Sequence, residues 1–405
     1  MISLSFDIVT VGGGLAASAF AASMAKNGMR VLVLEKETQF KDRVRGEFVA
    51  TWGVAEAREL GIETQLFNTC ATPIPWIDMG FGPRNLVETT PQQLPCMSFF
   101  HPEMQEVLLA EAERAGAEVR RGVTVTSIQP GANPSLLAAI NGSEERIPAR
   151  IIVAADGRGS AARKWAGFSP QRNAQPFHFA GVLLTGVSGR KDMGTFVFNP
   201  ELGLVGGIVP QGNDRFRAYL GYPTDGSFTL QGSEKLGTFL AESRKVGPMF
   251  ADCYAQAKRL GPLASFDAGD VWIDHPYRDG VALIGEAGAT SDPSFGQGMS
   301  LSLRDARVLR DALLGDSDWD QAGHLYAEQH DIYFHRLHTV CVWMRKLFQE
   351  QGPEADARRQ TAMPRIVDDL SRVPDHLFGG PELPMDESVR ARFFGEDRLN
   401  SAKSA

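Results

Sequence analysis

The clearest chemical signal in the sequence is a glycine-rich turn, Gly12-Gly13-Gly14-Leu15-Ala16-Ala17, which matches the pattern GxGxxG/A. In this pattern Gly12 permits a tight turn, Gly14 lets the backbone approach a pyrophosphate, and Ala17 lets the next helix pack closely on its strand. Glu35 follows 23 residues after Gly12, where its carboxylate suits the hydroxyl groups of a ribose. This spacing predicts a dinucleotide site, with a ligand-free glycine turn as the alternative.

The residues on either side of this turn predict the strands and the helix that position it. Residues 7–11 and 30–34 are apolar and largely β-branched, which is typical of buried strands, and a helical pattern runs over 15–27 until Gly28. A strand, a helix and a second strand in this order form a βαβ unit with a right-handed crossover. We therefore expect a parallel sheet of the Rossmann type.

Two further segments end expected strands with glycines and an acidic residue. Asp156-Gly157 follows the apolar run 151–155, and Gly285-Glu286 follows the apolar run 281–284. Pro293 and the segment Gly296-Gln297-Gly298-Met299 come next, before a helical pattern over 300–314. These segments resemble the DG and GD motifs of the class A FAD monooxygenases, the group that includes para-hydroxybenzoate hydroxylase. Three motifs in the right order span about three quarters of the chain.

The resemblance implies FAD as the bound dinucleotide. Glu286 is expected to accept hydrogen bonds from ribityl hydroxyls, although the family usually has Asp there, and the helix start at 296–299 is expected to face the flavin N1/O2 edge. The segment 43–47 resembles the RxGE segment with which the family holds FAD, and His101 stands where the family commonly has Arg or Gln against the flavin. The full set of predicted cofactor-binding residues is Gly12, Gly14, Ala17, Glu35, Lys36, Arg43, Arg45, His101, Gln105, Val125, Asp156, Gly157, Gly285, Glu286, Pro293, Gly296, Gln297, Gly298 and Met299.

The reaction implied by the resemblance is hydroxylation by a single-component flavoprotein monooxygenase. NADPH or NADH would reduce FAD, O2 would add at flavin C4a, and the resulting hydroperoxyflavin would give one oxygen atom to an aromatic or electron-rich small molecule. A flavin-dependent reductase of C=C bonds, similar to the geranylgeranyl reductases, is the alternative. A halogenase is disfavoured because residues 204–210 retain the proline of the WxWxIP motif but have no Trp. A non-catalytic FAD-binding protein is the remaining alternative.

The substrate domain is expected as a mixed or antiparallel sheet inserted into the FAD-binding fold. The pattern between 177 and 222 changes to strands separated by turns, and we expect helices over 233–244 and 247–259 and a long core helix over 318–349. His178 is the candidate for a proton relay, and Phe179, Phe196 and Tyr219 are candidate pocket residues, with ordinary core positions as the alternative. The predicted boundaries are 1–72, 97–175 and 266–315 for the FAD-binding domain, 73–96 and 176–265 for the substrate domain, and 316–405 for a C-terminal helical region.

Composition and charge limit the partners, metal sites and cellular location that the chain can have. The 405 residues carry a net charge of −8, which disfavours nucleic acid as a partner. The four cysteines show no CxxC pair and no metal-site spacing, and the sequence has neither a signal-peptide pattern nor an apolar run long enough to span a bilayer. We expect a cytoplasmic enzyme that binds no metal, acts on a small molecule, does not span a membrane and exists as a monomer or homodimer.

Overall fold

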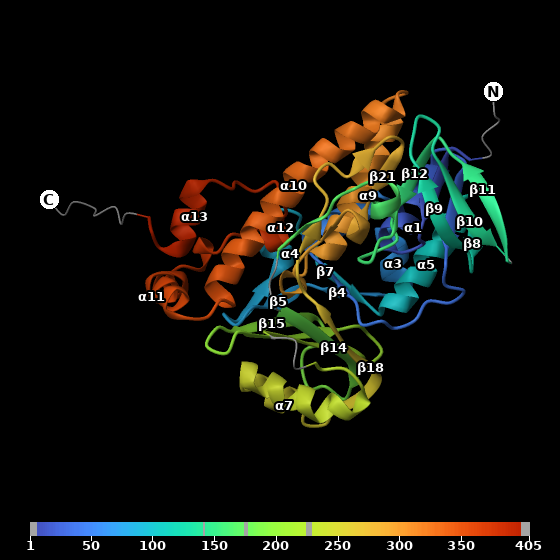
Figure 1. The fold of residues 1–405 in the computed structure, drawn as a ribbon. Helices are drawn as coiled ribbons and strands as arrows, with labels where there is room; N and C mark the ends of the chain where they lie inside the picture. Colours follow the sequence, from blue (N-terminus) through green and yellow to red (C-terminus); the bar gives the residue numbers. More distant parts are fainter. Residues whose placement is uncertain (1–5, 141, 174–176, 224–228, 398–405) are drawn as a thin grey trace.

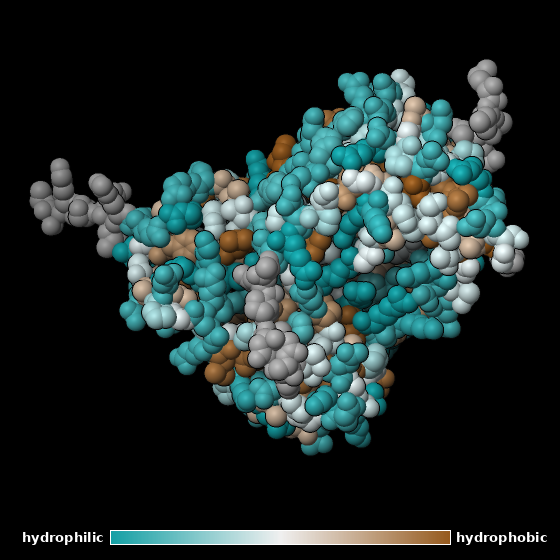
Figure 2. Space-filling view, viewed as in Figure 1, coloured by the Kyte–Doolittle hydropathy of each residue, from teal (hydrophilic) through white to brown (hydrophobic). Residues whose placement is uncertain are grey.

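The computed structural model describes residues 6–140, 142–173, 177–223 and 229–397, which include every predicted site residue. A parallel sheet with its helices forms one side of the molecule, and a second sheet lies beneath it (Figure 1). A group of helices from the C-terminal quarter lies at the end of the molecule opposite the N-terminus (Figure 1). The face seen in Figure 2 is mostly hydrophilic, with small separate hydrophobic patches.

The first sheet confirms the predicted Rossmann-type arrangement. Its strands pair in parallel except for β20, which runs antiparallel to β21 at one edge. Helix α1 (Leu15–Lys26) connects β1 to β2 and packs against α5 (His101–Arg114) and α9 (Gly298–Gly315). The strand order is β20 (Tyr277–Arg278), β21 (Val281–Leu283), β12 (Ile151–Ala154), β1 (Ile8–Val11), β2 (Val31–Glu35) and β8 (Glu118–Arg121).

The second sheet, which is antiparallel except between β15 and β5, separates two apolar layers. Alternate residues of β14 face α7 (Leu236–Val246) and α8 (Met249–Cys253), and the others face the parallel-sheet domain. Residues 73–96, which the sequence assigns to the substrate domain, supply the last two strands at one edge of this sheet. The order is β18 (Lys258–Asp267), β14 (Phe177–Thr185), β17 (Phe216–Pro223), β16 (Leu204–Pro210), β15 (Met193–Asn199), β5 (Trp76–Asp78) and β6 (Pro83–Asn85).

Three small sheets and short elements connect these layers. The first small sheet contains β3 (Phe48–Val49), β7 (Cys96–Phe99) and β4 (Ala71–Ile74); the second contains β11 (Ser143–Pro148), β10 (Ser135–Ile140) and β9 (Thr124–Gln129); the third contains β13 (Gln171–Arg172), β19 (Val271–Trp272) and β22 (Ala289–Thr290). The short helices are α2 (Thr51–Glu59), α3 (Glu63–Thr69), α4 (Leu86–Thr89), α6 (Ala162–Trp165), η1 (Ser233–Lys235), η2 (Gly285–Ala287) and η3 (Pro293–Phe295).

The C-terminal region is built on one long helix, α10 (Trp319–Phe348), close to the predicted range 318–349. The chain after α10 folds back through α11 (Pro353–Asp368), η4 (Leu370–Arg372), α12 (His376–Gly379) and α13 (Glu387–Phe394). Phe393 and Phe394 are buried in the same apolar cluster as residues of the second sheet. Among the described residues, no helix combines the length and apolarity needed to cross a bilayer.

The predicted helix over 247–259 is wrong. Only Met249–Cys253 is helical, and β18 begins at Lys258, where its residues pair with β14. The pairing of Arg259 with Leu184 and of Leu263 with Val182 satisfies the backbone in the sheet, and this tertiary contact overrides a weak helical pattern. The hairpin formed by β10 and β11 is a further element that the sequence reading did not predict.

Candidate active site

One cavity of about 610 Å³ lies where the carboxyl ends of the parallel strands meet the second sheet. This edge of a parallel sheet is where open α/β folds bind their ligands. Seventeen of the nineteen predicted cofactor residues line the cavity: Gly12, Gly14, Glu35, Lys36, Arg43, Arg45, His101, Gln105, Val125, Asp156, Gly157, Gly285, Glu286, Pro293, Gly296, Gly298 and Met299. The structure therefore brings together segments that lie as much as 287 residues apart in the sequence.

The glycine turn at the start of α1 lines this cavity. A Cβ added to Gly12 would lie 2.6 Å from the backbone oxygen of Ala155, and the φ of Gly12 is +100°, so only glycine fits there. A Cβ on Gly14 would have no atom nearer than Gln105 Nε2 at 3.9 Å, which means that its backbone is open to the cavity. The first N–H groups of α1 have no partner within the helix, and they suit an anionic group.

Two carboxylates hold the turns at the ends of their strands. Glu35 accepts hydrogen bonds from the N–H of Gly13 at 2.7 Å and of Glu37 at 2.8 Å. Asp156 Oδ2 accepts from the N–H of Ala161 at 2.8 Å, and its Oδ1 is buried with no hydrogen-bond partner among the described residues. A buried carboxylate oxygen without a partner is costly, so a donor from a bound ligand would stabilise it.

The segment between Gly285 and Met299 forms another part of the cavity wall. The N–H of Gly285 donates to Asp305 Oδ2 at 2.7 Å, and burial raises the pKa of the Asp305 carboxyl. The guanidinium of Arg163 donates to the backbone oxygen of Glu286, which fixes the turn while the Glu286 side chain lines the cavity. Helix α9 begins at Gly298 with no side-chain cap, so its first N–H groups are available to a ligand.

A buried ion-pair network supports the segment 42–47, which forms the floor beside the second sheet. Arg217, on β17, has a fully buried side chain, and it donates to Glu47 through Nε and Nη2 and to Asp42 through Nη2 at 2.9 Å. Gln211 also donates to Glu47. Burial alone would lower the pKa of Arg217, but the Glu47 carboxylate more than offsets this and raises it. This network fixes the loop that carries Arg43 and Arg45.

His101 is held at the start of α5 by the same loop. Its N–H donates to Glu47 Oε1 at 3.0 Å, and its ring Nδ1 lies 2.9 Å from the backbone oxygen of Gly46. Because a carbonyl oxygen only accepts, Nδ1 carries the proton and Nε2 is an acceptor. Burial lowers the pKa of His101, so the ring is neutral near pH 7. A neutral, oriented imidazole is thus presented at the cavity wall.

The second sheet gives the cavity an aromatic wall. Phe179, Phe196, Tyr219 and Phe266 all line it, and the rings of Phe179 and Tyr219 lie 5.5 Å apart. The hydroxyl of Tyr219 donates to the backbone oxygen of Arg45 at 2.9 Å, and burial raises the pKa of this phenol well above its ordinary value. Three of the candidate pocket residues named from the sequence therefore stand at the site, on the face of the sheet that is turned to the cofactor cradle.

Three predicted residues lie elsewhere. Ala17 is fully buried in α1, as close helix packing requires. Gln297 turns away from the cavity, and its side chain bonds to Trp52 Nε1 and to the backbone oxygens of Phe295 and Leu377. His178 does not line the cavity: strand alternation places it on the face of β14 opposite Phe179, where its ring lies edge-on to Tyr222 at 5.9 Å. The relay role of His178 thus loses its geometric basis.

Some cavity residues were not predicted from the sequence. Arg158 follows the Asp156-Gly157 pair directly, and its guanidinium donates to the backbone oxygens of Asp267 and Gly269 and lies 5.6 Å from the centre of the Phe266 ring. Its place beside a recognised motif is a signal that could have identified it. Arg217, which supports the cavity through Glu47 without lining it, carries no such signal, because Glu47 lies 170 residues away.

The composition of the cavity fits FAD. It offers a glycine cradle that a Cβ would fill, two helix starts with unpaired N–H groups, carboxylates at three strand ends and a wall of aromatic rings. These features match the pyrophosphate, the hydroxyl-rich ribose and ribityl groups, and the planar ring system of FAD.

Comparison with known proteins agrees with this geometry. Residues 5–315 match the family described as the FAD binding domain, which covers more than half of the chain. Rifampicin monooxygenase of Streptomyces venezuelae is 26% identical over 375 residues, covering 87% of this chain and 74% of that protein. Digeranylgeranylglycerophospholipid reductase of Methanocella arvoryzae is 24% identical over 334 residues, covering 75% of this chain and 76% of that protein.

Solved structures share the fold. The p-nitrophenol 4-monooxygenase PnpA of Pseudomonas putida DLL-E4 superimposes with a TM-score of 0.77 at 18% identity, covering 92% of this chain and 96% of that chain. The flavin-dependent brominase Bmp2 gives a TM-score of 0.75 at 18% identity, covering 93% of each chain. The predicted fold class, an FAD-binding α/β domain with a second sheet, is confirmed.

Proposed function

Because the chain belongs to the FAD binding domain family, we propose that it is a single-component flavoprotein monooxygenase that hydroxylates an aromatic or electron-rich small molecule. NADPH or NADH and O2 would be its co-substrates. The observation that carries this proposal is the union, in one cavity, of the cofactor cradle and the aromatic wall. Rifampicin monooxygenase, among the most similar relatives, supports oxygenation.

The residues of this chain would hold the cofactor in a defined order. The turn 12–14 and the start of α1 would bind the pyrophosphate, Glu35 the ribose, Glu286 the ribityl chain, and the start of α9 the N1/O2 edge of the flavin. Arg43, Arg45 and Asp156 would complete the binding of the cofactor. FAD, when bound, would supply hydride acceptance and the activation of O2.

The remaining task of the protein is to orient the substrate and exclude water. The rings of Phe179 and Phe196 can pack against a planar substrate and displace water from the reacting face. His101 is neutral, and its Nδ1 binds the Gly46 oxygen, so its Nε2 can accept a hydrogen bond from a substrate hydroxyl at the cavity wall. This assigns to His101 the proton-handling role that His178 is badly placed to perform.

Reduction of C=C bonds is the second candidate, and the reductase of Methanocella arvoryzae is the observation that favours it. Oxygen consumption separates the two reactions, because a reductase needs no O2 and releases no hydroxylated product. A halogenase has less support: β16 keeps Pro210 but contains no Trp, whereas halogenases of this type carry a WxWxIP motif in the corresponding strand.

The test is anaerobic reduction of the FAD-loaded protein by NADPH and by NADH, followed by flavin absorbance. A panel of neutral phenols, aromatic acids and polycyclic compounds is added to separate samples. Bleaching that one compound accelerates, followed by O2-dependent reoxidation with formation of its hydroxylated product, is the expected result. If neither nucleotide reduces the flavin with any compound, the single-component mechanism is wrong.

A further inference from the structure

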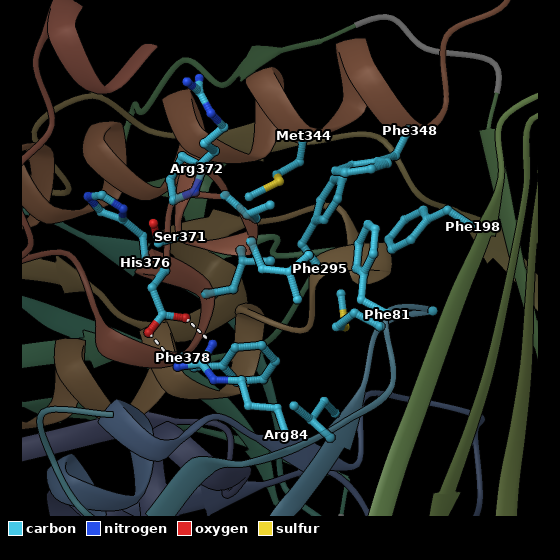
Figure 3. Close-up of a pocket in the computed structure, with 18 of the residues that line it drawn as sticks. Phe81, Arg84, Phe198, Phe295, Met344, Phe348, Ser371, Arg372, His376 and Phe378 are labelled. Atoms are coloured by element: carbon cyan, nitrogen blue, oxygen red, sulfur yellow. Dashed lines mark hydrogen bonds and ion pairs between the residues drawn. The ribbon is translucent and has the colours of Figure 1, made fainter. Parts of the chain in front are cut away.

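A second cavity, of about 770 Å³, lies beside the cofactor cavity, and Phe295 is its one lining residue from the three sequence motifs. Its walls come from β15, from the loop after β5, from α10 and from the C-terminal segment 363–392 (Figure 3). The size falls within the range of about 300–1,000 Å³ that is typical of sites for small organic ligands. The sequence predicts only a helical region for residues 316–405. The structure shows that part of this region forms a cavity wall.

The lining is rich in aromatic and thioether side chains. Phe81, Phe198, Phe295, Phe348 and Phe378 contribute rings, and Figure 3 shows Phe198, Phe295 and Phe348 close together beside Met344. The ring of Phe198 stacks on Phe295 at 5.9 Å and lies 5.5 Å from Phe348. Aromatic faces favour stacked or edge-on aromatic partners, and methionines adapt to irregular apolar shapes.

The charged groups at the cavity are already paired. Arg84 binds Asp375 through two contacts of 2.6 and 2.8 Å, which Figure 3 marks with dashed lines. Arg372 binds Asp397 at 3.0 Å, and Arg392 binds Asp369 at 2.9 Å. Among the described residues, the Arg, Lys, Asp and Glu side chains that line the cavity are Arg84, Arg372, Asp375 and Arg392, and each of them belongs to one of these ion pairs. An anionic ligand would therefore compete with carboxylates that already bind these arginines, and an uncharged ligand would not.

One strand and one loop contribute residues to both cavities. Phe196 lines the cofactor cavity and Phe198 lines the second cavity, and because they are two positions apart on β15 their Cα atoms are about 7 Å apart. In the loop before α9, Pro293 and Gly296 line the cofactor cavity while Phe295 lines the second one. The second cavity thus adjoins the cofactor cavity at Phe198 and Phe295.

The C-terminal wall is tied to the cofactor helix. Gln297, which precedes α9, donates to the backbone oxygen of Leu377 at 3.1 Å, and Thr51 donates to the backbone oxygen of Phe378. Both Leu377 and Phe378 line the second cavity. The wall is therefore an integral part of the folded protein rather than a loosely attached tail.

We propose that the second cavity binds the body of the substrate, and that this substrate is an uncharged molecule with fused aromatic rings. The proposal rests on the proposed function for the identity of the reaction, but the binding site stands on the lining, the paired charges and the shared strand. The reacting ring is presented toward the cofactor cavity between Phe196 and Phe295. The C-terminal segment is the specificity wall.

Binding to the FAD-loaded protein tests this proposal directly. The probes are 9-phenanthrenol, which is neutral at pH 7.5, and phenanthrene-9-carboxylate, which is anionic, and each is titrated by calorimetry. We expect the phenol to bind at least tenfold more tightly than the carboxylate. Equal or tighter binding of the carboxylate would overturn the assignment to an uncharged ligand.

Cavity-filling variants locate the site. Met363→Trp and Met79→Trp place a larger ring at two partly exposed lining positions, and each is expected to raise the Kd for 9-phenanthrenol at least tenfold. Val367→Trp is the matched control, because Val367 lies on the same helix as Met363 but is 65% exposed and outside the lining, and its Kd is expected to stay within twofold. FAD content and thermal melting verify that each variant folds.

The results separate the two proposals. If both lining variants bind 9-phenanthrenol as the unmodified protein does, the second cavity is not the binding site, whatever the protein oxidises. If binding follows the cavity variants but no compound gives an O2-dependent product, the binding site stands and the monooxygenase function is wrong.

Discussion

Replacement of Glu47 by Gln tests whether the buried network beneath the cavity determines stability and cofactor retention. Glu47 and Arg217 both have fully buried side chains, and the carboxylate accepts from Arg217, from Gln211 and from the N–H of His101. Glutamine keeps the shape of the side chain but removes the charge. Asp42, at 2.9 Å from Arg217 Nη2, is then the one carboxylate left within ion-pair distance of that guanidinium among the described residues.

The expected cost follows from burial. Removal of one partner of a buried ion pair leaves an uncompensated charge and costs about 3–5 kcal/mol. The remaining contact to Asp42, whose side chain is 11% exposed, places the expected loss at the lower end, at about 3 kcal/mol. Because Glu47 also fixes the loop that lines the cofactor cavity, we expect a weaker hold on FAD as well.

The assay is urea unfolding of the FAD-loaded protein followed by tryptophan fluorescence, together with release of FAD. Glu103→Gln is the matched control: Glu103 also pairs with an arginine, Arg215, at 2.7 and 2.9 Å, but its side chain is 45% exposed. An exposed pair contributes about 0–1 kcal/mol, so this variant should unfold nearly as the unmodified protein does. If Glu47→Gln costs no more than Glu103→Gln, burial of the network does not act as argued.

Three further predictions follow from the same geometry. Gly12→Ala should abolish FAD binding, because the added Cβ would lie 2.6 Å from the backbone oxygen of Ala155. Gly28→Ala is the control and should bind FAD, because Gly28 also has a positive φ but its Cβ would have no atom within 4 Å. FAD absorbance after gel filtration measures binding in both variants. Burial lowers the pKa of His376 from 6.5, so the folded state binds this proton less readily than the unfolded state does. The protein should therefore lose stability as the pH falls below 6.5. The variant His376→Gln should reduce that loss in melting experiments, and an unchanged pH dependence would contradict this argument. Arg345→Met should cost about 3 kcal/mol in urea unfolding, because it leaves two buried carboxylates without their cation.

The cofactor side of the protein could be predicted from the sequence because its signals are local. Gly12 needs a positive φ and Glu286 ends a strand, and each property is encoded within a few residues of the motif itself. The parallel sheet could be predicted for the same reason, since buried strands are continuous apolar runs. Seventeen predicted residues therefore line one cavity, although the role of each in binding stays a prediction.

The substrate side depends on contacts between distant segments, which one sequence does not reveal. His178 and Phe179 are adjacent and equally plausible as pocket residues, and only the orientation of β14 against α7 and the cofactor domain decides that Phe179 faces the cavity. Lys258–Asp267 becomes a strand because β14 offers an unpaired edge. In both cases the register of a tertiary pairing determines the outcome.

Gln297 shows how a motif position can serve a neighbour of the site rather than the ligand. The family resemblance predicts contact with the cofactor, but its side chain bonds to Trp52 and to the backbone of the C-terminal segment, while the glycines on either side of it line the cofactor cavity. The start of α9 and the wall of the second cavity are thereby linked through one amide. A ligand that displaces this wall should therefore also act on the helix start that would face the flavin. The variant Gln297→Ala should uncouple ligand binding from the rate of flavin reduction. The measurement is the rate of flavin reduction by NAD(P)H: 9-phenanthrenol should no longer accelerate it, while the FAD content is unchanged. Persistent acceleration in this variant would show that the amide only braces the fold.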